Sequence, residues 1–176
     1  MLACVDVDYR EDESTAVAAC VLFHRWQDEL PADEKTAIIP SVEDYVPGQF
    51  FKRELPCILR VLEGVGVPLD AVIIDGYVWL GNRDQPGLGG HLYEALQKQV
   101  PIVGVAKTRF AGATLAVEVL RGTSAKQLHV TAAGMDVQVA ATRLKSMHGP
   151  FRIPTMVKRA DQLCRRQPST TSTRPL

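Results

Sequence analysis

The sequence predicts an α/β fold in which helices flank a mixed, five-stranded sheet made of an antiparallel meander and two parallel strands. Three strand-like segments open the chain, and the short gaps between them favour an antiparallel meander. Two continuous apolar runs follow, each after a helical segment, as is typical of parallel strands covered on both faces. The 46% hydrophobic content of the 176 residues suits a substantial core.

The first part of the chain is expected to form three strands and a helix. Residues 2–9 (LACVDVDY), 14–26 and 35–41 are apolar and rich in β-branched side chains, which favours strands. A Pro-Gly pair then interrupts the chain. Apolar residues recur at helical spacing from Phe50 to Leu62, and a glycine-containing segment follows, so a helix is expected between them.

The later part of the chain is expected to continue the sheet and its helical cover. A strand over 69–77 ends in an Asp-Gly pair, and a glycine-rich loop over 81–90 leads to a helix over 91–99. The apolar run over 100–108 is another buried strand. Residues 114–122 and 127–133 are expected to be a strand pair that could form a hairpin. Helices are expected over 135–147 and 155–166, followed by a polar tail over 167–176. We therefore expect a single domain over residues 1–166 and a frayed tail after it.

Composition narrows the class of protein. The 20 Lys and Arg residues balance 20 Asp and Glu residues, which argues against charge-driven binding of nucleic acid over the whole surface. No apolar run reaches the length of a bilayer span, and no secretory signal is expected. The four cysteines have neither CxxC nor zinc spacing, which is typical of structural thiols in a reducing compartment. We expect a cytoplasmic monomer that does not associate with a membrane.

Two acidic residues from distant parts of the chain are expected to meet. Asp6 lies in the first strand, and Asp75 ends the strand that follows the first helix. In such a sheet a right-handed crossover makes these two strands parallel neighbours. Adjacent like charges repel unless a cation lies between them, and hard divalent ions such as Mg²⁺ take carboxylate ligands.

One motif is more specific than the rest. The stretch YVPGQFFKRE, from Tyr45 to Glu54, has the spacing of the Y-[IV]-P-G-x(5)-E motif of the endonuclease V family. The blocks CVDVDY, VIIDG, PIVGVAKTRF and FRIPTMVKRADQL resemble further blocks of that family in the same order, including its C-terminal pattern of R-[LI]-P followed by A-D. Together they cover the chain from residue 2 to about 165, and the sequence resembles a divergent member of the family.

The resemblance implies a fold of the RNase H-like superfamily and a hydrolase activity. Members of the family cleave a phosphodiester near a deaminated base, typically inosine, in DNA or RNA, and they use Mg²⁺ or Mn²⁺. A role in nucleic-acid repair is implied with it. The implied metal ligands are Asp6, Glu54 and Asp75, which with Lys107 are also the implied catalytic residues. The implied nucleic-acid contacts are Tyr45, Pro47, Gly48, Gly76, His91 and Lys107.

The residue types suit these implied roles. Lys107 follows a strand directly, and its amine would stabilise charge that develops on the scissile phosphate. Tyr45, held in a stiff Pro-Gly turn, would fill the gap left by an extruded base. His91 is expected near the N-terminus of a helix, where phosphate contacts are favoured.

The sequence departs from the family pattern at two places. After Asp75 the family reads D-G-x-G-x-x-H-P-R, whereas this chain reads DGYVWLGNRDQPGLGGHL, with Val78 at the expected glycine and no His-Pro pair. Val78 and Trp79 would either block the approach of a base or offer it a different stacking surface. Near the C-terminus Gln138 aligns with an acidic residue of the family, and Asp136 is a candidate substitute. The alternative function is therefore a weakly active or inactive relative that binds nucleic acid or a protein partner.

Overall fold

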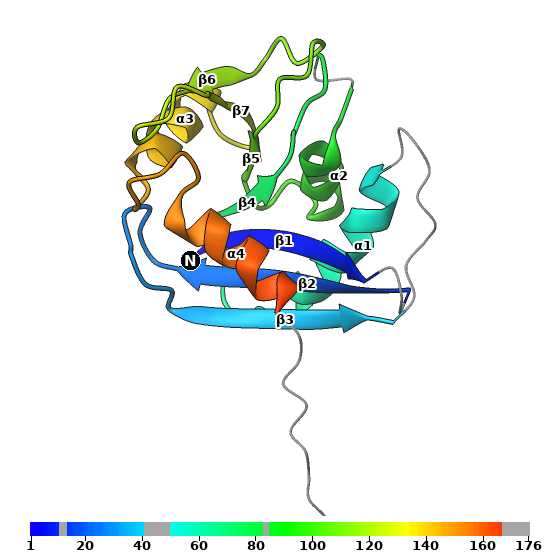
Figure 1. Cartoon of the computed structure of the whole chain (residues 1–176). Helices are drawn as coiled ribbons and strands as arrows, with labels where there is room; N and C mark the ends of the chain where they lie inside the picture. Colours follow the sequence, from blue (N-terminus) through cyan, green and yellow to red (C-terminus); the bar gives the residue numbers. More distant parts are fainter. Residues whose placement is uncertain (11–13, 41–49, 83–84, 167–176) are drawn as a thin grey trace, which may run out of the picture.

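The computed structural model of the chain describes residues 1–10, 14–40, 50–82 and 85–166 (Figure 1). Within these residues the strands form one seven-stranded sheet in the order β3-β2-β1-β4-β5-β7-β6. The strands are β1 (Leu2–Arg10), β2 (Thr15–Phe23), β3 (Asp33–Ile39), β4 (Ala71–Asp75), β5 (Ile102–Ala106), β6 (Val117–Val119) and β7 (Leu128–Ala133). The helices are α1 (Phe50–Glu63), α2 (Leu88–Ala95), α3 (Val137–Ser146) and α4 (Thr155–Arg165).

The helices cover both faces of the sheet (Figure 1). On one face α1 and α2 pack on the sheet through a core that contains Ile58 and Leu92. On the other face α3 and α4 pack through a second core that contains Leu144, Met156 and Ala160. Apolar side chains of β1 alternate between the two cores, as the period of a strand requires. None of the helices in the described part of the chain is long and apolar enough to cross a membrane.

The predicted fold class is confirmed, but the predicted number of strands is wrong. The antiparallel meander β1-β2-β3 and the parallel strands β1, β4 and β5 are present as expected. The described residues hold seven strands rather than five, because the predicted strand pair at 114–122 and 127–133 joins the same sheet. β7 pairs antiparallel with β5, with Ile102 opposite Ala133. Its residues Leu128 to Thr131 are all buried, so the core extends over this strand.

Several element boundaries differ from those predicted. β2 ends at Phe23 because the next residues turn back, and the Asp28 carboxylate accepts hydrogen bonds from the N–H groups of His24 and Arg25, at 3.0 and 2.9 Å. The helix predicted over 91–99 begins at Leu88 and ends at Ala95. The last two glycines of the predicted loop therefore belong to α2. The predicted domain boundary at residue 166 stays a prediction, since the tail 167–176 lies outside the described residues.

The pairing of β1 with β4 positions the carboxylates. The two strands are parallel, as predicted, and Val5 lies opposite Ile74. Their pairing stops there, while β1 continues to Arg10 beside β2 alone. Asp6 and Asp75 therefore occupy the next positions on neighbouring strands, where the sheet divides.

The glycines of α2 allow a close approach that a side chain would prevent. A Cβ on Gly89 would lie 2.8 Å from Cγ2 of Val78 and 2.9 Å from Cδ1 of Ile74, inside the apolar core. We expect Gly89→Ala to lower the free energy of unfolding by about 1–3 kcal/mol, because the core has no room for the methyl group. Urea denaturation measures the change.

The matched control is Gly66→Ala. A Cβ at Gly66 would meet nothing within 4 Å, so the free energy of unfolding of this variant should lie within about 1 kcal/mol of the wild-type value. Equal stability of the two variants would contradict the close packing of α2.

Candidate active site

Three carboxylates from separate elements line one narrow hollow in the sheet. Asp6 comes from β1, Asp75 is the last residue of β4, and Glu54 comes from α1. All three line the same hollow, together with apolar side chains that include Ile58 and Leu88. We call Asp6, Glu54 and Asp75 the carboxylate cluster. The structure thus brings together the three residues predicted as metal ligands.

Glu54 belongs to the buried side of α1. Cys57, Ile58 and Val61 follow it at helical spacing, and all three are buried against the sheet. The Glu54 side chain is only 8% exposed. Burial raises the pKa of its carboxyl group to about 8, and the negative charges of Asp6 and Asp75 contribute in the same direction. A carboxylate is held here where an amphipathic helix would ordinarily place an apolar residue.

Asp6 shows the same effect to a smaller degree. Burial, together with the charges of Asp75 and Asp161, raises the pKa of Asp6 to about 6. The N–H of Val7 donates a hydrogen bond to Oδ1 of Asp6 at 2.9 Å, which opposes the shift and orients the carboxylate. Ionising either of these two carboxyl groups in the folded protein therefore costs free energy.

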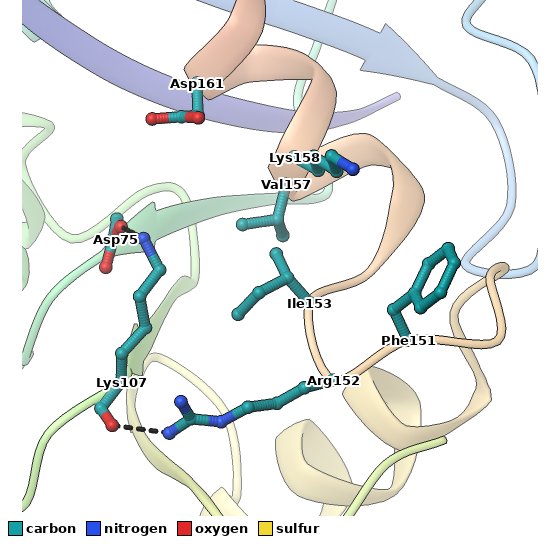
Figure 2. Close-up of a pocket in the computed structure, with 8 residues that line it drawn as sticks. All are labelled: Asp75, Lys107, Phe151, Arg152, Ile153, Val157, Lys158 and Asp161. Carbon is teal, nitrogen blue, oxygen red and sulfur yellow. Dashed lines mark hydrogen bonds and ion pairs between the residues drawn. The ribbon is translucent and has the colours of Figure 1, made fainter. Parts of the chain in front are cut away.

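Lys107 compensates part of this charge. It follows β5 directly, and its Nζ forms an ion pair with Oδ2 of Asp75 (Figure 2). Burial alone would lower the pKa of Lys107, but the hydrogen bond to Asp75 and the nearby carboxylates raise it overall. The amine is therefore a permanent cation beside the cluster, as the chemistry predicted for Lys107 requires.

Asp161 of α4 is a fourth acidic residue near the cluster, and it was not among the residues predicted for the site. It lines a hollow together with Asp75 and Lys107 (Figure 2). Its charge also helps to raise the pKa of Asp6. The signal for it was present in the sequence, since Asp161 is the acid of the C-terminal A-D pattern.

Asp136, the candidate substitute for the missing C-terminal acid, has a different role. Its carboxylate accepts hydrogen bonds from the N–H groups of Gln138 and Val139, at 2.8 and 3.0 Å, and so caps α3. It lines a separate hollow with Trp79 and Tyr93. The assignment of Asp136 as a substitute for that acid was therefore wrong.

A second hollow opens beside Asp75, on the side of α1 and α2. It has a volume of about 290 Å³ and is mostly apolar. We call it the base hollow; it is lined by Phe51, Glu54, Asp75, Gly76, Tyr77, Leu80, Pro86, Gly87 and Leu88. Gly76 has φ of +144°, a conformation that side-chain-bearing residues rarely adopt, so its backbone forms part of the wall.

The chain after Asp75 is tied to the sheet by side-chain hydrogen bonds. The hydroxyl of Tyr77 donates to the carbonyl oxygen of Thr108 at 2.8 Å and accepts from the N–H of Phe110 at 3.0 Å. The N–H of Val78 donates to Oγ1 of Thr131 at 2.8 Å, and Nε1 of Trp79 donates to the carbonyl of Ala132 at 2.9 Å. This segment is therefore a fixed part of the site.

His91 lies in the first turn of α2, near the helix N-terminus as predicted, but its N–H is not free to bind a phosphate. α2 begins at Leu88, and the N–H of His91 already donates to the carbonyl of Gly87 at 3.1 Å. Its ring stacks on Phe51 with centroids 3.7 Å apart. Burial lowers the pKa of His91, which favours the neutral ring. His91 thus supports Phe51, a residue of the base hollow.

The comparison with known proteins decides the family. Residues 1–137 match the family model described as Endonuclease V. The chain belongs to the endonuclease V family. Endonuclease V of Streptomyces avermitilis is 30% identical over 92% of this chain and 78% of its own length. Endonuclease V of Xanthomonas campestris is 37% identical over 64% of this chain, and the match spans 46% of that relative.

Solved structures of endonuclease V share the fold. The Streptomyces avermitilis enzyme has a TM-score of 0.74 at 27% identity, over 93% of this chain and 79% of that one. Endonuclease V of Ciona intestinalis, in complex with a 24mer DNA that contains an inosine followed by a ribo-adenosine, has a TM-score of 0.75 at 19% identity. That match covers 93% of this chain and 84% of the other.

The altered loop of this family member leaves the base hollow open. Val78, at the position of a family glycine, is fully buried and belongs to the core beneath the loop. Trp79 is directed toward β7 by its hydrogen bond to Ala132. Neither residue blocks the hollow. Tyr45, Pro47 and Gly48, predicted to contact nucleic acid, lie in the segment 41–49 outside the described residues.

The chemistry of the carboxylate cluster suits a hard divalent cation. Its donors are carboxylate oxygens, which Mg²⁺ and Mn²⁺ prefer, and the repulsion among them would fall when a cation binds. In the part of the chain that the structure describes, no three His, Cys, Asp or Glu side chains form a ready-made metal-binding group. Instead Lys107 supplies the positive charge at Asp75. Asp6, Glu54 and Asp75 therefore fit a metal ion by donor type and charge.

The raised pKa of Glu54 predicts a stability that depends on pH. The folded state holds a proton on Glu54 up to about pH 8, whereas the unfolded chain releases it near pH 4.5. The folded state thus loses stability as the pH rises from about 4.5 to 8. Without divalent ions, the wild-type Tm should fall relative to that of Glu54→Gln by roughly 5 °C across this range.

Scanning calorimetry at pH 5 and pH 8.5 measures this difference, first in a chelator and then in Mg²⁺. Mg²⁺ should raise the Tm of the wild type at pH 8.5 more than at pH 5, and more than that of Glu54→Gln. Parallel pH curves for the two proteins would show that Glu54 does not titrate in this range.

Proposed function

We propose that this protein is a divalent-metal-dependent endonuclease that hydrolyses a phosphodiester near a deaminated base, such as inosine, in DNA or RNA. The observation that carries the proposal is the convergence of Asp6, Glu54 and Asp75 beside Lys107 and next to the base hollow. Family membership supports the reaction class. A role in nucleic-acid repair, a cytoplasmic location and a monomeric state form part of the proposal.

The carboxylate cluster would hold Mg²⁺, or alternatively Mn²⁺. The bound ion would neutralise phosphate charge, lower the pKa of a coordinated water and orient its attack. The cluster supplies the ligands from three elements, so the fold and not the ion fixes their positions. The hydrogen bond from Val7 to Oδ1 of Asp6 holds that carboxylate in one orientation.

Lys107 would act on the phosphate. Its amine lies beside Asp75 and stays protonated at neutral pH, because the surrounding carboxylates raise its pKa. A cation held next to the metal ligands would stabilise the charge that develops on the scissile phosphate and its leaving oxygen. Lys107 is thus proposed as a catalytic residue, in contact with the reacting group.

The base hollow would receive the extruded base. It is concave, mostly apolar and adjacent to the cluster. Phe51, backed by the ring of His91, offers an aromatic surface to a base. The complex of the Ciona intestinalis relative with inosine-containing DNA supports this choice of substrate. Tyr45, Pro47 and Gly48 remain the proposed wedge.

The first test is cleavage by Asp75→Asn. Wild-type protein with Mg²⁺ or Mn²⁺ should nick inosine-containing oligonucleotides, and Asp75→Asn should lower the rate by about 10³-fold or more, because it removes a metal ligand and the partner of Lys107. Gel analysis of end-labelled single- and double-stranded DNA and RNA measures the rate.

The matched control is Asp136→Asn. This change removes the same charge from a carboxylate that caps α3 away from the cluster, so cleavage should stay close to the wild-type rate. Failure of the wild type to cleave any of these substrates, with or without inosine, would overturn the proposal.

The alternative, a relative that binds nucleic acid or a protein partner without efficient cleavage, rests on the altered loop and the zero net charge. It predicts binding that needs no metal and survives Asp6→Asn. A gel shift in chelator, equal for wild type and Asp6→Asn and without cleavage in Mg²⁺, would favour the alternative.

A further inference from the structure

A groove leaves the carboxylate cluster on the side opposite to the base hollow. It has a volume of about 320 Å³ and is bounded by α4 and the segment before it (Figure 2). We call it the Phe151 groove; it is lined by Asp75, Lys107, Phe151, Arg152, Ile153, Val157, Lys158 and Asp161. Asp75 lines both this groove and the base hollow, so the cluster lies between the two.

The groove combines an exposed aromatic ring with positive charge. Phe151 is 64% exposed, so its ring is accessible to a ligand. The amine of Lys158 lies 5.7 Å from the centre of its ring. Lys107 stands at the other end, beside Asp75, and the side chains of Ile153 and Val157 lie between (Figure 2). Aromatic stacking surfaces with nearby cations are the means by which proteins bind unpaired nucleotides.

The groove is built before any ligand arrives. Arg121 is 5% exposed, and its guanidinium donates hydrogen bonds to the carbonyl oxygens of Met147 and Phe151, the latter at 2.8 Å. Gly122 has φ of +58°, and a Cβ there would lie 2.1 Å from the carbonyl oxygen of Pro150. These contacts hold the segment that carries Phe151 against the rest of the fold, so its exposure costs no loop ordering on binding.

Arg152 links this segment to the chain that follows β5. Its guanidinium donates to the carbonyl oxygen of Lys107 (Figure 2) and to the carbonyl oxygen of Gln127. Nη2 of Arg152 is therefore held by the backbone, and Lys107 and Lys158 are the other two cations that line the groove. Phe151 and Lys107 thus keep a fixed relation to each other across the groove.

We propose that the Phe151 groove binds an unpaired nucleotide on the side of the scissile phosphodiester away from the recognised base. The base of this unpaired nucleotide would stack on Phe151, and a phosphate would lie near Lys158. This inference rests on the proposed function, because the base hollow defines the other side of the cut. A nucleic-acid strand whose scissile phosphate lies at the carboxylate cluster must extend away from the cluster on both sides of that phosphate. The groove offers a path for one side, because it is continuous with the cluster at Asp75. Its cations match the phosphates of the strand.

The test measures binding and does not depend on cleavage. Fluorescence anisotropy in chelator compares wild type, Phe151→Ala and Phe151→Trp on single-stranded oligonucleotides that carry one inosine. Phe151→Ala should weaken binding by about tenfold, and Phe151→Trp should restore it, because one base–aromatic stack contributes on the order of 1–3 kcal/mol. The control is Val67→Ala, which should bind like the wild type. Val67 is an apolar residue that is 44% exposed, and it precedes β4, so it lies at the end of that strand opposite to Asp75.

Abasic substitutions locate the stacked base. An abasic nucleotide is moved along each flank of the inosine, and at one position beyond the cleaved bond it should abolish the difference between wild type and Phe151→Ala. Lys158→Ala should reduce the slope of log affinity against log salt concentration by about 1, which is the contribution of one phosphate contact.

Equal affinities of wild type and Phe151→Ala would overturn the proposal, as would a difference that no abasic position removes, since that result marks a structural effect. Absence of wild-type binding would overturn it too. Wild-type binding with the expected abasic position but no cleavage in Mg²⁺ would refute the endonuclease function alone and leave the groove as a nucleotide-binding site.

Discussion

The parallel pairing of β1 with β4 is the contact on which the rest of the site depends. It sets Val5 opposite Ile74, and so it places Asp6 and Asp75 side by side where the two strands separate. Glu54 reaches the same point from α1, and Asp161 approaches from α4 on the other face of the sheet. A one-residue shift in this register would turn the acids to opposite faces and dissolve the cluster.

The collected carboxylates also impose an electrostatic constraint. Burial raises the pKa of Glu54 and of Asp6, so ionising these carboxyl groups destabilises the folded protein. Lys107 offsets part of that cost at Asp75. A site held together in this way gains stability when a cation binds, which couples metal binding to folding. The cost of assembling the acids is thus the physical basis of the affinity that the proposed function requires.

Rigid supports surround the cluster on both sides. Tyr77 ties the segment after Asp75 to the chain that follows β5, and Trp79 ties it to β7. Arg121 binds the backbone of the segment before α4, and Arg152 links that segment to the carbonyl of Lys107. The base hollow and the Phe151 groove therefore keep fixed positions relative to the carboxylates. Such preorganisation lets binding energy be used for positioning the scissile phosphate instead of ordering loops.

The sequence by itself determined the mixed α/β class, the meander, the parallel partners of the first strand and the convergence of Asp6 and Asp75, because these follow from periodicity and from the handedness of crossovers. Motif spacing identified Glu54 and Lys107 as further residues of the site. Only the tertiary structure decided that β6 and β7 extend the sheet, that Asp161 and not Asp136 lies near the cluster, and that His91 backs Phe51. It also showed that Val78 and Trp79 leave the base hollow open. These outcomes depend on tertiary contacts between side chains that are distant in the sequence, and local sequence patterns do not determine such contacts.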